Sequence, residues 1–419
     1  MKPRNVPTAK PVIVVGLGFG DEGKGATVDW LCAQGGVSAV VRFNGGAQAA
    51  HNVVADGIHH TFAQFGSGTL AGVPTYLSDK MLIEPISLAA EADALERIGV
   101  GDPFSMLTVH PDALLTTPVH VAANRTREDA RGTGRHGSCG RGIGETAFYE
   151  TVNPAAPRVR DCLDPVVLRN KLDAMAYFYE PLIGSGGHSH PAVDAMCDLY
   201  TEFAGAVRIA GNGYLTDRAT TGRLVLEGAQ GVLLDEWRGF HPHTTWSTTT
   251  PANARTLLRS IGQPAGFVLG VLRTYQTRHG AGPLPSEDCT LHRLLPEPHN
   301  GTGVYQGDWR VGHLDPVVLR YAVQACGGLD GLALTHLDRI GAGGAVREYR
   351  YRDHLVRKLP LGPAKDLDHQ SDLTRLLASS STILDPLPNT GPEFSASIEQ
   401  LLGAPVVLRS DGPDRKNRY

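Results

Sequence analysis

Six short apolar runs constrain the fold of this chain more than any other feature of its sequence. They are PVIVVGL (11–17), SAVVRF (38–43), RLVLEGA (223–229), AGFVLGVL (265–272), GLALTHLD (331–338) and APVVLRS (404–410). The runs are apolar on both faces, as the buried strands of a parallel sheet are. ISLAAEADALERIG (86–99) and DPVVLRYAVQACG (315–327) have helical spacing. We therefore expect an α/β fold with a large, mostly parallel sheet flanked by helices.

The rest of the chain is expected to belong to the same unit. Residues 1–419 are predicted to form a single large α/β domain with a helical, loop-rich insertion around 150–220. The net charge of −4 gives no basic footprint for nucleic acid, and no apolar run is long enough to span a membrane. The six cysteines form no C-x-x-C pair, so we predict neither a disulfide framework nor a zinc site, and a reducing compartment such as the cytoplasm.

The stretch GLGFGDEGKG (16–25) lies between the first apolar run and a helical segment. Its spacing G-x-x-x-x-G-K matches a phosphate-binding loop, in which backbone N–H groups and a lysine hold the phosphates. The usual Ser or Thr that holds magnesium is Gly25 here, and two carboxylates lie inside the loop. A solvated loop carboxylate is the simplest alternative for Asp21. We predict a P-loop-like nucleotide site formed by Gly20, Glu22, Gly23, Lys24 and Gly25.

Further blocks follow in a fixed order along the chain. After GFGDEGKGATVDWL come VRFNGGAQAAHNVV, GSCGRGIGE, VLEGAQGVLLDEWRGFHPHTTWSTTT, TRHGAGPLPSE, GHLDPVVLRYAVQ, THLD and SDGPDR. Together they resemble adenylosuccinate synthetase, the GTP-dependent ligase of purine biosynthesis. The resemblance spans residues 12–415, and GDEGKG and EGAQG are its most specific parts.

The resemblance implies a mechanism that accounts for the unusual loop. Asp21 would take the N1 proton of IMP while the 6-oxygen attacks the γ-phosphate of GTP, and His51 would stabilise that transfer. Gln230 would read the hypoxanthine ring. Mg²⁺ would be held by Asp21 and the backbone carbonyl of Ala50, so that Gly25 needs no hydroxyl group. A carboxylate beside Mg²⁺ stays ionised, and the ion screens it from the phosphates.

The resemblance also implies a guanine pocket. Asp338 of THLD matches the aspartate that accepts hydrogen bonds from guanine, which favours GTP over ATP. Thr335 lies in the same motif, and Ser410 and Gly412 match the segment that completes the pocket. The lysine of this motif in the family is His336 here.

The acceptor side departs from the family pattern. Gln48 stands at the position of a phosphate-contacting asparagine, and Cys139 at that of a phosphate-contacting threonine; Ser138 precedes it. Gln230 and Thr245 match the family. An arginine that reaches the phosphate from the neighbouring subunit of a homodimer falls near Pro154, with Arg158 and Arg160 as nearby substitutes. We therefore expect a reshaped acceptor-phosphate pocket.

The amino-acid loop departs further. The family has an arginine cluster that clamps the carboxylates of aspartate, whereas this chain reads GTGVYQGDWRVGHLD (301–315). Thr302 remains, Arg310 is the one arginine left, and Asp308 adds a negative charge. Arginine–carboxylate pairs are strong and shape-specific, so we expect an amine donor other than aspartate, in a pocket lined by Tyr305, Trp309 and Arg310. Compensation by Arg273 or Arg278 is the alternative.

Three hypotheses follow. The first is a GTP- and Mg²⁺-dependent ligase that phosphorylates the 6-oxo group of IMP or a similar purine nucleotide and installs an amine, with a donor other than aspartate in a specialised pathway. The second is an ordinary adenylosuccinate synthetase that uses IMP, aspartate and GTP. The third is a non-catalytic guanine-nucleotide-binding paralogue. Retention of both Asp21 and His51 argues against the third, because binding alone needs neither.

Overall fold

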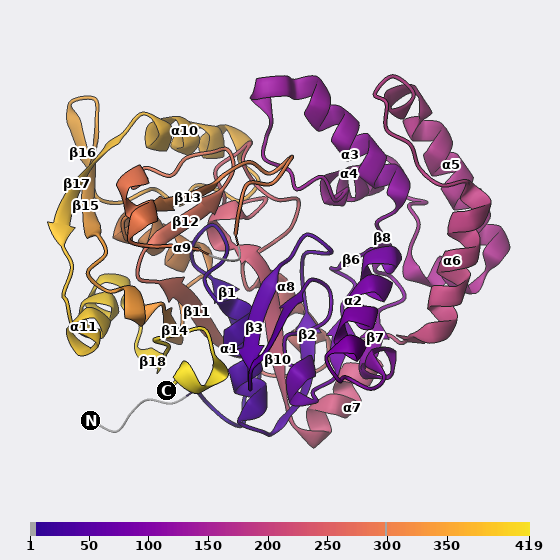
Figure 1. Cartoon of the computed structure of the whole chain (residues 1–419), viewed down its shortest axis with the longest axis horizontal. Helices are drawn as coiled ribbons and strands as arrows, with labels where there is room; N and C mark the ends of the chain where they lie inside the picture. The colour runs from indigo at the N-terminus through magenta and orange to yellow at the C-terminus, as the bar shows by residue number, and fades with distance from the viewer. Residues whose placement is uncertain (1–5, 298–299) are drawn as a thin grey trace.

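The computed structural model describes residues 6–297 and 300–419. A nine-stranded sheet runs through the molecule, and every neighbouring pair in it is parallel (Figure 1). In spatial order its strands are β18 (Val406–Arg409), β14 (Gly331–Thr335), β11 (Phe267–Arg273), β1 (Val12–Gly16), β10 (Arg223–Gly231), β2 (Val37–Arg42), β5 (Thr75–Leu77), β7 (Leu107–Val109) and β9 (Arg208–Ile209).

The six apolar runs of the sequence all lie in this sheet, as β1, β2, β10, β11, β14 and β18. The α/β fold is therefore confirmed. Central strand β1 is buried along its whole length, and its neighbours β10 and β11 are nearly so. Burial on both faces explains why these strands lack polar alternation. Sequence reasoning missed β5, β7 and β9, which extend the sheet at one edge with two or three residues each.

Helices connect the strands and cover the sheet. They are α1 (Lys24–Ala33), α2 (Pro85–Arg97), α3 (Pro118–Arg131), α4 (Ile143–Val152), α5 (Pro165–Ile183), α6 (Val193–Ala206), α7 (Gly213–Thr221), α8 (Ala252–Ser260), α9 (Pro316–Ala325), α10 (Leu367–Ala378) and α11 (Gly391–Leu402). The two predicted helices are α2 and α9. Each begins with proline after an acidic N-cap, Glu84 or Asp315, whose side chain accepts backbone N–H groups of the first turn.

Smaller sheets accompany the large one. They are β3 (His51–Ala55) with β4 (Ile58–Phe62), β6 (Leu82–Ile83) with β8 (Leu114–Leu115), β12 (Gln276–His279) with β13 (Trp309–Gly312), and β15 (Gly344–Tyr351) with β16 (His354–Val356) and β17 (Ser381–Pro386). In the antiparallel pair β12–β13, His279 lies opposite Trp309. His279 in turn lies near Asp21 of the loop after β1.

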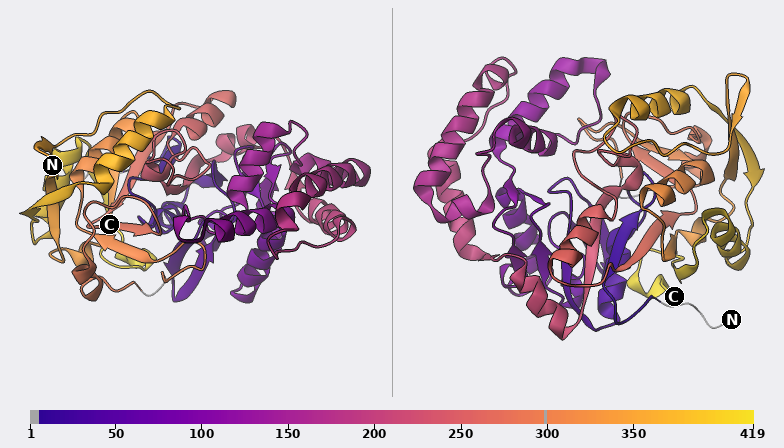
Figure 2. Two further views of the ribbon diagram at one scale, coloured as in Figure 1. Left: turned by 90° about the horizontal axis from the view of Figure 1, so that it is seen from above. Right: turned by 180° about the vertical axis from the view of Figure 1, so that it is seen from behind.

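The core falls into clusters on either side of the sheet. One large cluster lies between β1, β11, β14 and the helices α8, α9 and α11, and another joins β5 and β7 to α2, α3, α5 and α6. Helices α3 to α6 gather at one side of the molecule (Figure 2). The region 150–220 contains α5, α6 and α7 with loops between them, and β9 pairs with β7 at the sheet edge. Within the described residues, no helix has the length and apolarity needed to cross a membrane.

Candidate active site

A cleft of about 780 Å³ opens at the carboxyl ends of the central strands, where parallel sheets usually bind ligands. Asp21 follows β1, Gln230 lies near the end of β10, and Thr335 ends β14. Most of the predicted site residues line the cleft: Gly20, Asp21, Gly23, Lys24, Gly25, Gln48, Ala50, His51, Ser138, Cys139, Gln230, Thr245, Thr335, Asp338, Ser410 and Gly412. Three do not line it: Glu22, Thr302 and Arg310.

The structure gives a steric reason for Gly25, where a phosphate-binding loop usually has Ser or Thr. A Cβ atom at this position would lie 2.6 Å from Cβ of His51 and 2.9 Å from Oγ of Ser67. Real Cβ atoms do not approach other atoms so closely. Because Gly25 has no side chain, His51 can pack directly against the start of α1.

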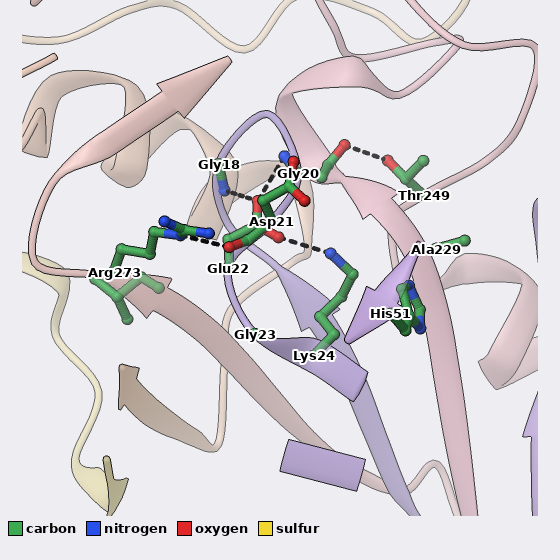
Figure 3. A network of polar contacts seen from close by, with 12 residues as sticks. Gly18, Gly20, Asp21, Glu22, Gly23, Lys24, His51, Ala229, Thr249 and Arg273 are labelled. Atoms are coloured by element: carbon green, nitrogen blue, oxygen red, sulfur yellow. Dashed lines mark hydrogen bonds and ion pairs between the residues drawn. The ribbon is translucent and has the colours of Figure 1, made fainter. Parts of the chain in front are cut away.

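Asp21 projects from the loop into the cleft. Its backbone has a φ of +62°, and its carbonyl oxygen accepts a hydrogen bond from Nε of Arg273. Its carboxylate lies 3.6 Å from Nε2 of His279. Figure 3 shows Asp21 above Glu22 and Lys24. The side chain of Lys24 lies between Glu22 and His51 in this view.

His51 is oriented by a buried carboxylate that sequence reasoning missed. Nδ1 of His51 lies 2.6 Å from Oε1 of Glu227, and Glu227 also accepts hydrogen bonds from the backbone N–H and the hydroxyl of Ser67. Burial raises the pKa of Glu227, but the charge of Arg42 and the hydrogen bonds from His51 and Ser67 outweigh it and hold the pKa at about 2. Burial lowers the pKa of His51, and Glu227 opposes this effect. The other ring nitrogen, Nε2, has no partner among the described residues.

Three residues that line the cleft share an unusual backbone conformation. Asp21, Gln230 and His336 have φ values of +62°, +58° and +60°. Residues other than glycine seldom adopt this left-handed conformation, and such strain is concentrated at functional sites. Each of the three lies near or just after the carboxyl end of a strand of the large sheet, so the strained residues gather at that end of the sheet.

The residues predicted to hold guanine lie on two neighbouring loops, joined by a hydrogen bond from the N–H of Leu337 to the carbonyl of Ser410. Oγ of Ser410 donates to the carbonyl of Gly412 over 2.8 Å, and Asp338 forms an ion pair with Arg339 at 3.0 Å. Nδ1 of His336 lies 2.9 Å from Oγ1 of Thr335. Burial lowers the pKa of His336 well below its ordinary value of 6.5, so its ring is neutral where the family has a charged lysine.

The acceptor side contains the buried amide of Gln48. Both amide atoms of Gln48 are buried and have no hydrogen-bond partner among the described residues. Oγ of Ser138 donates to Oδ1 of Asn124 over 2.9 Å, and burial raises the pKa of the Cys139 thiol. Arg158 pairs with Glu150 and Arg160 with Asp112; neither lines the cleft.

The arginines near the amino-acid loop already form hydrogen bonds and ion pairs with other groups of the protein. Nε of Arg310 donates to Glu287 over 2.9 Å, and Nη1 donates to the carbonyls of Gly280 and Gly282 over 2.8 Å. A second bond from Nη2 completes the ion pair with Glu287. Tyr305 and Trp309, like Arg310, do not line the cleft. Thr302 donates to Asp308 over 2.7 Å.

The end of the cleft beside Asp21 is lined instead by other residues of the same region. They include Arg273, Arg278, His279, Glu297 and Asn300. Arg273 pairs with Glu297 at 3.1 Å and also donates to Tyr275, while Arg278 donates to three backbone carbonyls. His279 could have been predicted as a site residue, because it lies in the block TRHGAGPLPSE. Glu297 and Asn300 could not, because their loop matches no motif.

Comparisons with known proteins agree with this geometry. Residues 13–419 match the family described as adenylosuccinate synthetase. The chain is 34% identical over 424 residues to the adenylosuccinate synthetase of Alkalilimnicola ehrlichii, with 97% of both proteins covered. It is 33% identical over 434 residues to that of Neisseria gonorrhoeae, with 97% of this chain and 98% of the relative covered.

Solved structures share the fold. The fully ligated adenylosuccinate synthetase of Plasmodium falciparum matches with a TM-score of 0.82 at 21% identity and covers 99% of both chains. The succinoaminodeoxyadenylate synthetase of cyanophage S-2L, bound to dGMP and dATP as an energy donor, matches with a TM-score of 0.63 at 19% identity, covering 99% of this chain and 95% of that one. The chain belongs to the adenylosuccinate synthetase family, and it is a GTP-dependent C–N ligase that uses Mg²⁺.

Proposed function

We propose that the chain transfers the γ-phosphoryl group of GTP to the 6-oxygen of IMP or a similar purine nucleotide, and that an amine other than aspartate then displaces the phosphate. Asp21 takes the proton from N1 as the 6-oxygen attacks phosphorus and GDP leaves. The amine forms the C–N bond at C6, the C–O bond breaks, and inorganic phosphate departs with the proton that the amine loses. General-base catalysis of this kind contributes about 10²–10⁴-fold.

The residues around the cleft support these roles. Among the described residues Nε2 of His51 has no partner, while Nδ1 faces the carboxylate of Glu227. Once the ring is protonated, Nε2 donates a hydrogen bond to the phosphoryl group in transfer, and Glu227 stabilises the positive charge of the ring. Oε1 of Gln230 is buried and has no partner in the part of the chain that the structure describes, which suits recognition of a purine N–H group. Thr335, Asp338, Ser410 and Gly412 would hold guanine.

The donor set near Asp21 fits Mg²⁺. Among the described residues no group of three or more His, Cys, Asp or Glu side chains could hold a metal. Mg²⁺ is usually bound by one or two carboxylates together with substrate phosphates, and Asp21 with the carbonyl of Ala50 is a set of that kind. When bound, the ion neutralises charge on the phosphate oxygens.

The observation that carries the choice of donor is the occupation of the arginines. Arg273 is bound by Glu297, Arg278 by backbone carbonyls, and Arg310 by Glu287. A donor with two carboxylates needs about two bidentate arginines, and here it would have to displace acceptors of the chain. A smaller or less acidic amine meets no such competition.

Ordinary adenylosuccinate synthetase activity is the second candidate. The names of the curated relatives favour it, whereas the occupied arginines oppose it. The cyanophage neighbour, which binds dGMP, supports the idea that this fold serves more than one acceptor. From the family resemblance we further propose a homodimer in the cytoplasm.

Heavy-oxygen labelling tests the proposed chemistry. The full chain is mixed with GTP, Mg²⁺ and an amine panel, together with IMP that carries heavy oxygen at the 6-position. We expect the label to appear in the released inorganic phosphate, read by mass spectrometry. Asp21→Ala should release no labelled phosphate while its GTP affinity stays within about tenfold, because the base and a metal ligand disappear together. Unlabelled phosphate from the wild-type protein would contradict phosphorylation of the 6-oxygen.

A further inference from the structure

The guanidinium group of Arg418 is buried in the wall of the cleft and lacks a full set of partners. Arg418 lines the cleft and is 9% exposed. Nη1 donates to the carbonyl of Asp414 over 2.9 Å and to that of Pro413 over 3.5 Å, whereas Nε is buried and has no hydrogen-bond partner among the described residues. A buried donor without an acceptor is unfavourable, so the cleft side of Arg418 suits a ligand that supplies one.

Arg418 is also a buried cation without a carboxylate of its own. Within residues 6–297 and 300–419 no Asp or Glu side chain forms an ion pair with it, whereas the neighbouring Arg415 pairs with Asp29 at 2.6 Å. Burial lowers the pKa of Arg418 to about 10, against the charges of Asp29 and Asp414, so the group is still charged at neutral pH. A buried charge needs hydrogen-bond acceptors, which favours a ligand atom with free lone pairs.

The backbone places Arg418 beside the residues predicted to hold guanine. Arg418 forms an antiparallel bridge with Ser410, and the carbonyl of Ser410 accepts the N–H of Leu337 over 3.0 Å. Burial lowers the pKa of His336, and the charges of Arg273 and Arg418 add to this effect. The guanidinium group therefore acts on both loops of the predicted pocket.

We propose that Arg418 donates hydrogen bonds to the 6-oxygen of guanine and so helps the enzyme to take GTP in preference to ATP. The two acceptor oxygens of Asp338 suit the N1–H and the 2-amino group of guanine. The adjacent 6-oxygen is an acceptor, and arginine is the commonest side-chain partner of the 6-oxygen and N7 of guanine. Adenine carries an amino group at position 6, which would set donors against donors.

Arg418 is thus a specificity-determining residue, and its role does not depend on which amine is the donor. The inference rests on the proposed guanine pocket and adds a second reader of the base to it. A site that is built to hydrogen-bond one group discriminates strongly against an analogue without that group, because its buried polar atoms are left unpaired.

Nucleotide binding by the full-length chain tests this role. Calorimetry in the presence of Mg²⁺ is carried out with GDP, ADP and 6-thio-GDP, in which sulfur, a weaker acceptor, replaces the 6-oxygen. Arg418→Met keeps a long apolar side chain and removes the donors. We expect its affinity for GDP to fall about 10- to 10²-fold and its affinity for ADP to stay the same or rise. Wild-type protein should bind 6-thio-GDP more weakly than GDP, whereas the variant should bind the two nearly equally.

Two further variants complete the design. Lys416→Met is the matched control, because Lys416 is exposed in the same C-terminal turn and does not line the cleft; it should bind all three nucleotides as wild type does. Arg418→Lys keeps the charge without the planar fork and replaces Arg418→Met if that variant folds poorly. Its preference for GDP over 6-thio-GDP should be smaller than that of wild type.

The outcomes separate this inference from the pocket on which it rests. Equal losses of affinity for all three nucleotides in Arg418→Met would overturn the proposal, because they would place the arginine on the ribose or the phosphates. An unchanged preference for GDP over ADP and 6-thio-GDP in the Arg418 variants would also overturn it and leave the guanine pocket standing. Wild-type protein that binds GDP and ADP equally well would refute the pocket itself.

Discussion

At the scale of the residue, Glu227 is the clearest group that the structure adds to the site. We expect Glu227→Gln to lower kcat by about 10²-fold or more, with little change in the KM for GTP, because His51 acts in the transition state. The amide cannot stabilise the charge or fix the proton of the ring as a carboxylate does. Steady-state kinetics with GTP and IMP checks this. An unchanged kcat would show that Glu227 serves only the fold.

Asp338 carries a second prediction at this scale. Asp338→Asn should weaken GTP use, because a carboxylate with two acceptor oxygens becomes an amide with one acceptor and one donor group. XTP, whose base edge is reversed there, should gain relative to GTP. The ratio of kcat/KM for the two nucleotides measures the change. Wild-type protein that uses ATP and GTP equally well would refute the assignment of the guanine pocket.

Site residues that lie in sequence motifs could be predicted, whereas contacts between residues that are distant in the sequence could not. Asp21, His51 and Gln230 were found because their blocks match a family, and all three line the cleft; their roles remain proposals. The partners of Arg310 were not predictable, because Glu287 lies 23 positions away and comes near it through a bridge between Glu287 and Gly312 that follows no sequence pattern. Glu22 was expected to bind nucleotide, since spacing alone does not show where a side chain points.

At the scale of the element, strands that are buried on both faces were predicted well and short edge strands were not. All six apolar runs became strands of the sheet. β7 has three residues and β9 has two, too few to give a periodic pattern. Their pairing depends on tertiary packing against the cluster beneath α2 and α6.

The N-cap of α9 makes a pH-dependent prediction. Asp315 accepts N–H groups of Val317 and Val318 and the hydroxyl of Tyr349. Burial raises its pKa from 3.8 to about 6, against the effect of these hydrogen bonds. The folded state therefore binds more protons than the unfolded state between these values, and Asp315 makes the protein less stable as the pH rises through that window.

Asp315→Asn removes this titration and keeps a good N-cap. Relative to wild type, the free energy of unfolding of the variant should rise by up to about 3 kcal/mol between pH 4 and pH 7, at about 1.4 kcal/mol per unit of pKa shift. Urea unfolding at several pH values measures the difference. A difference that is constant with pH, or that favours wild type at pH 7 more than at pH 4, would contradict the assigned shift.

At the scale of the whole molecule, the site draws on nearly the full length of the chain. The cleft is lined by residues from Phe19 to Arg418, brought together at the carboxyl ends of parallel strands. We propose that the chain is one domain, because β9 pairs with β7 and joins the region 150–220 to the sheet. Local sequence patterns could not predict how these segments come together, since the arrangement depends on contacts between residues that are distant in the sequence.

Competition among amine donors tests the central claim most directly. With GTP, Mg²⁺ and IMP held constant, wild-type protein is given aspartate, asparagine, simple amines and ammonium, and the nucleotide products are measured by mass spectrometry. Each missing charge-assisted contact costs roughly 1.5–3 kcal/mol, so kcat/KM for aspartate should lie about 10²-fold or more below that of the best neutral donor. Saturable formation of adenylosuccinate at sub-millimolar aspartate would contradict the proposal and make the chain an ordinary member of its family.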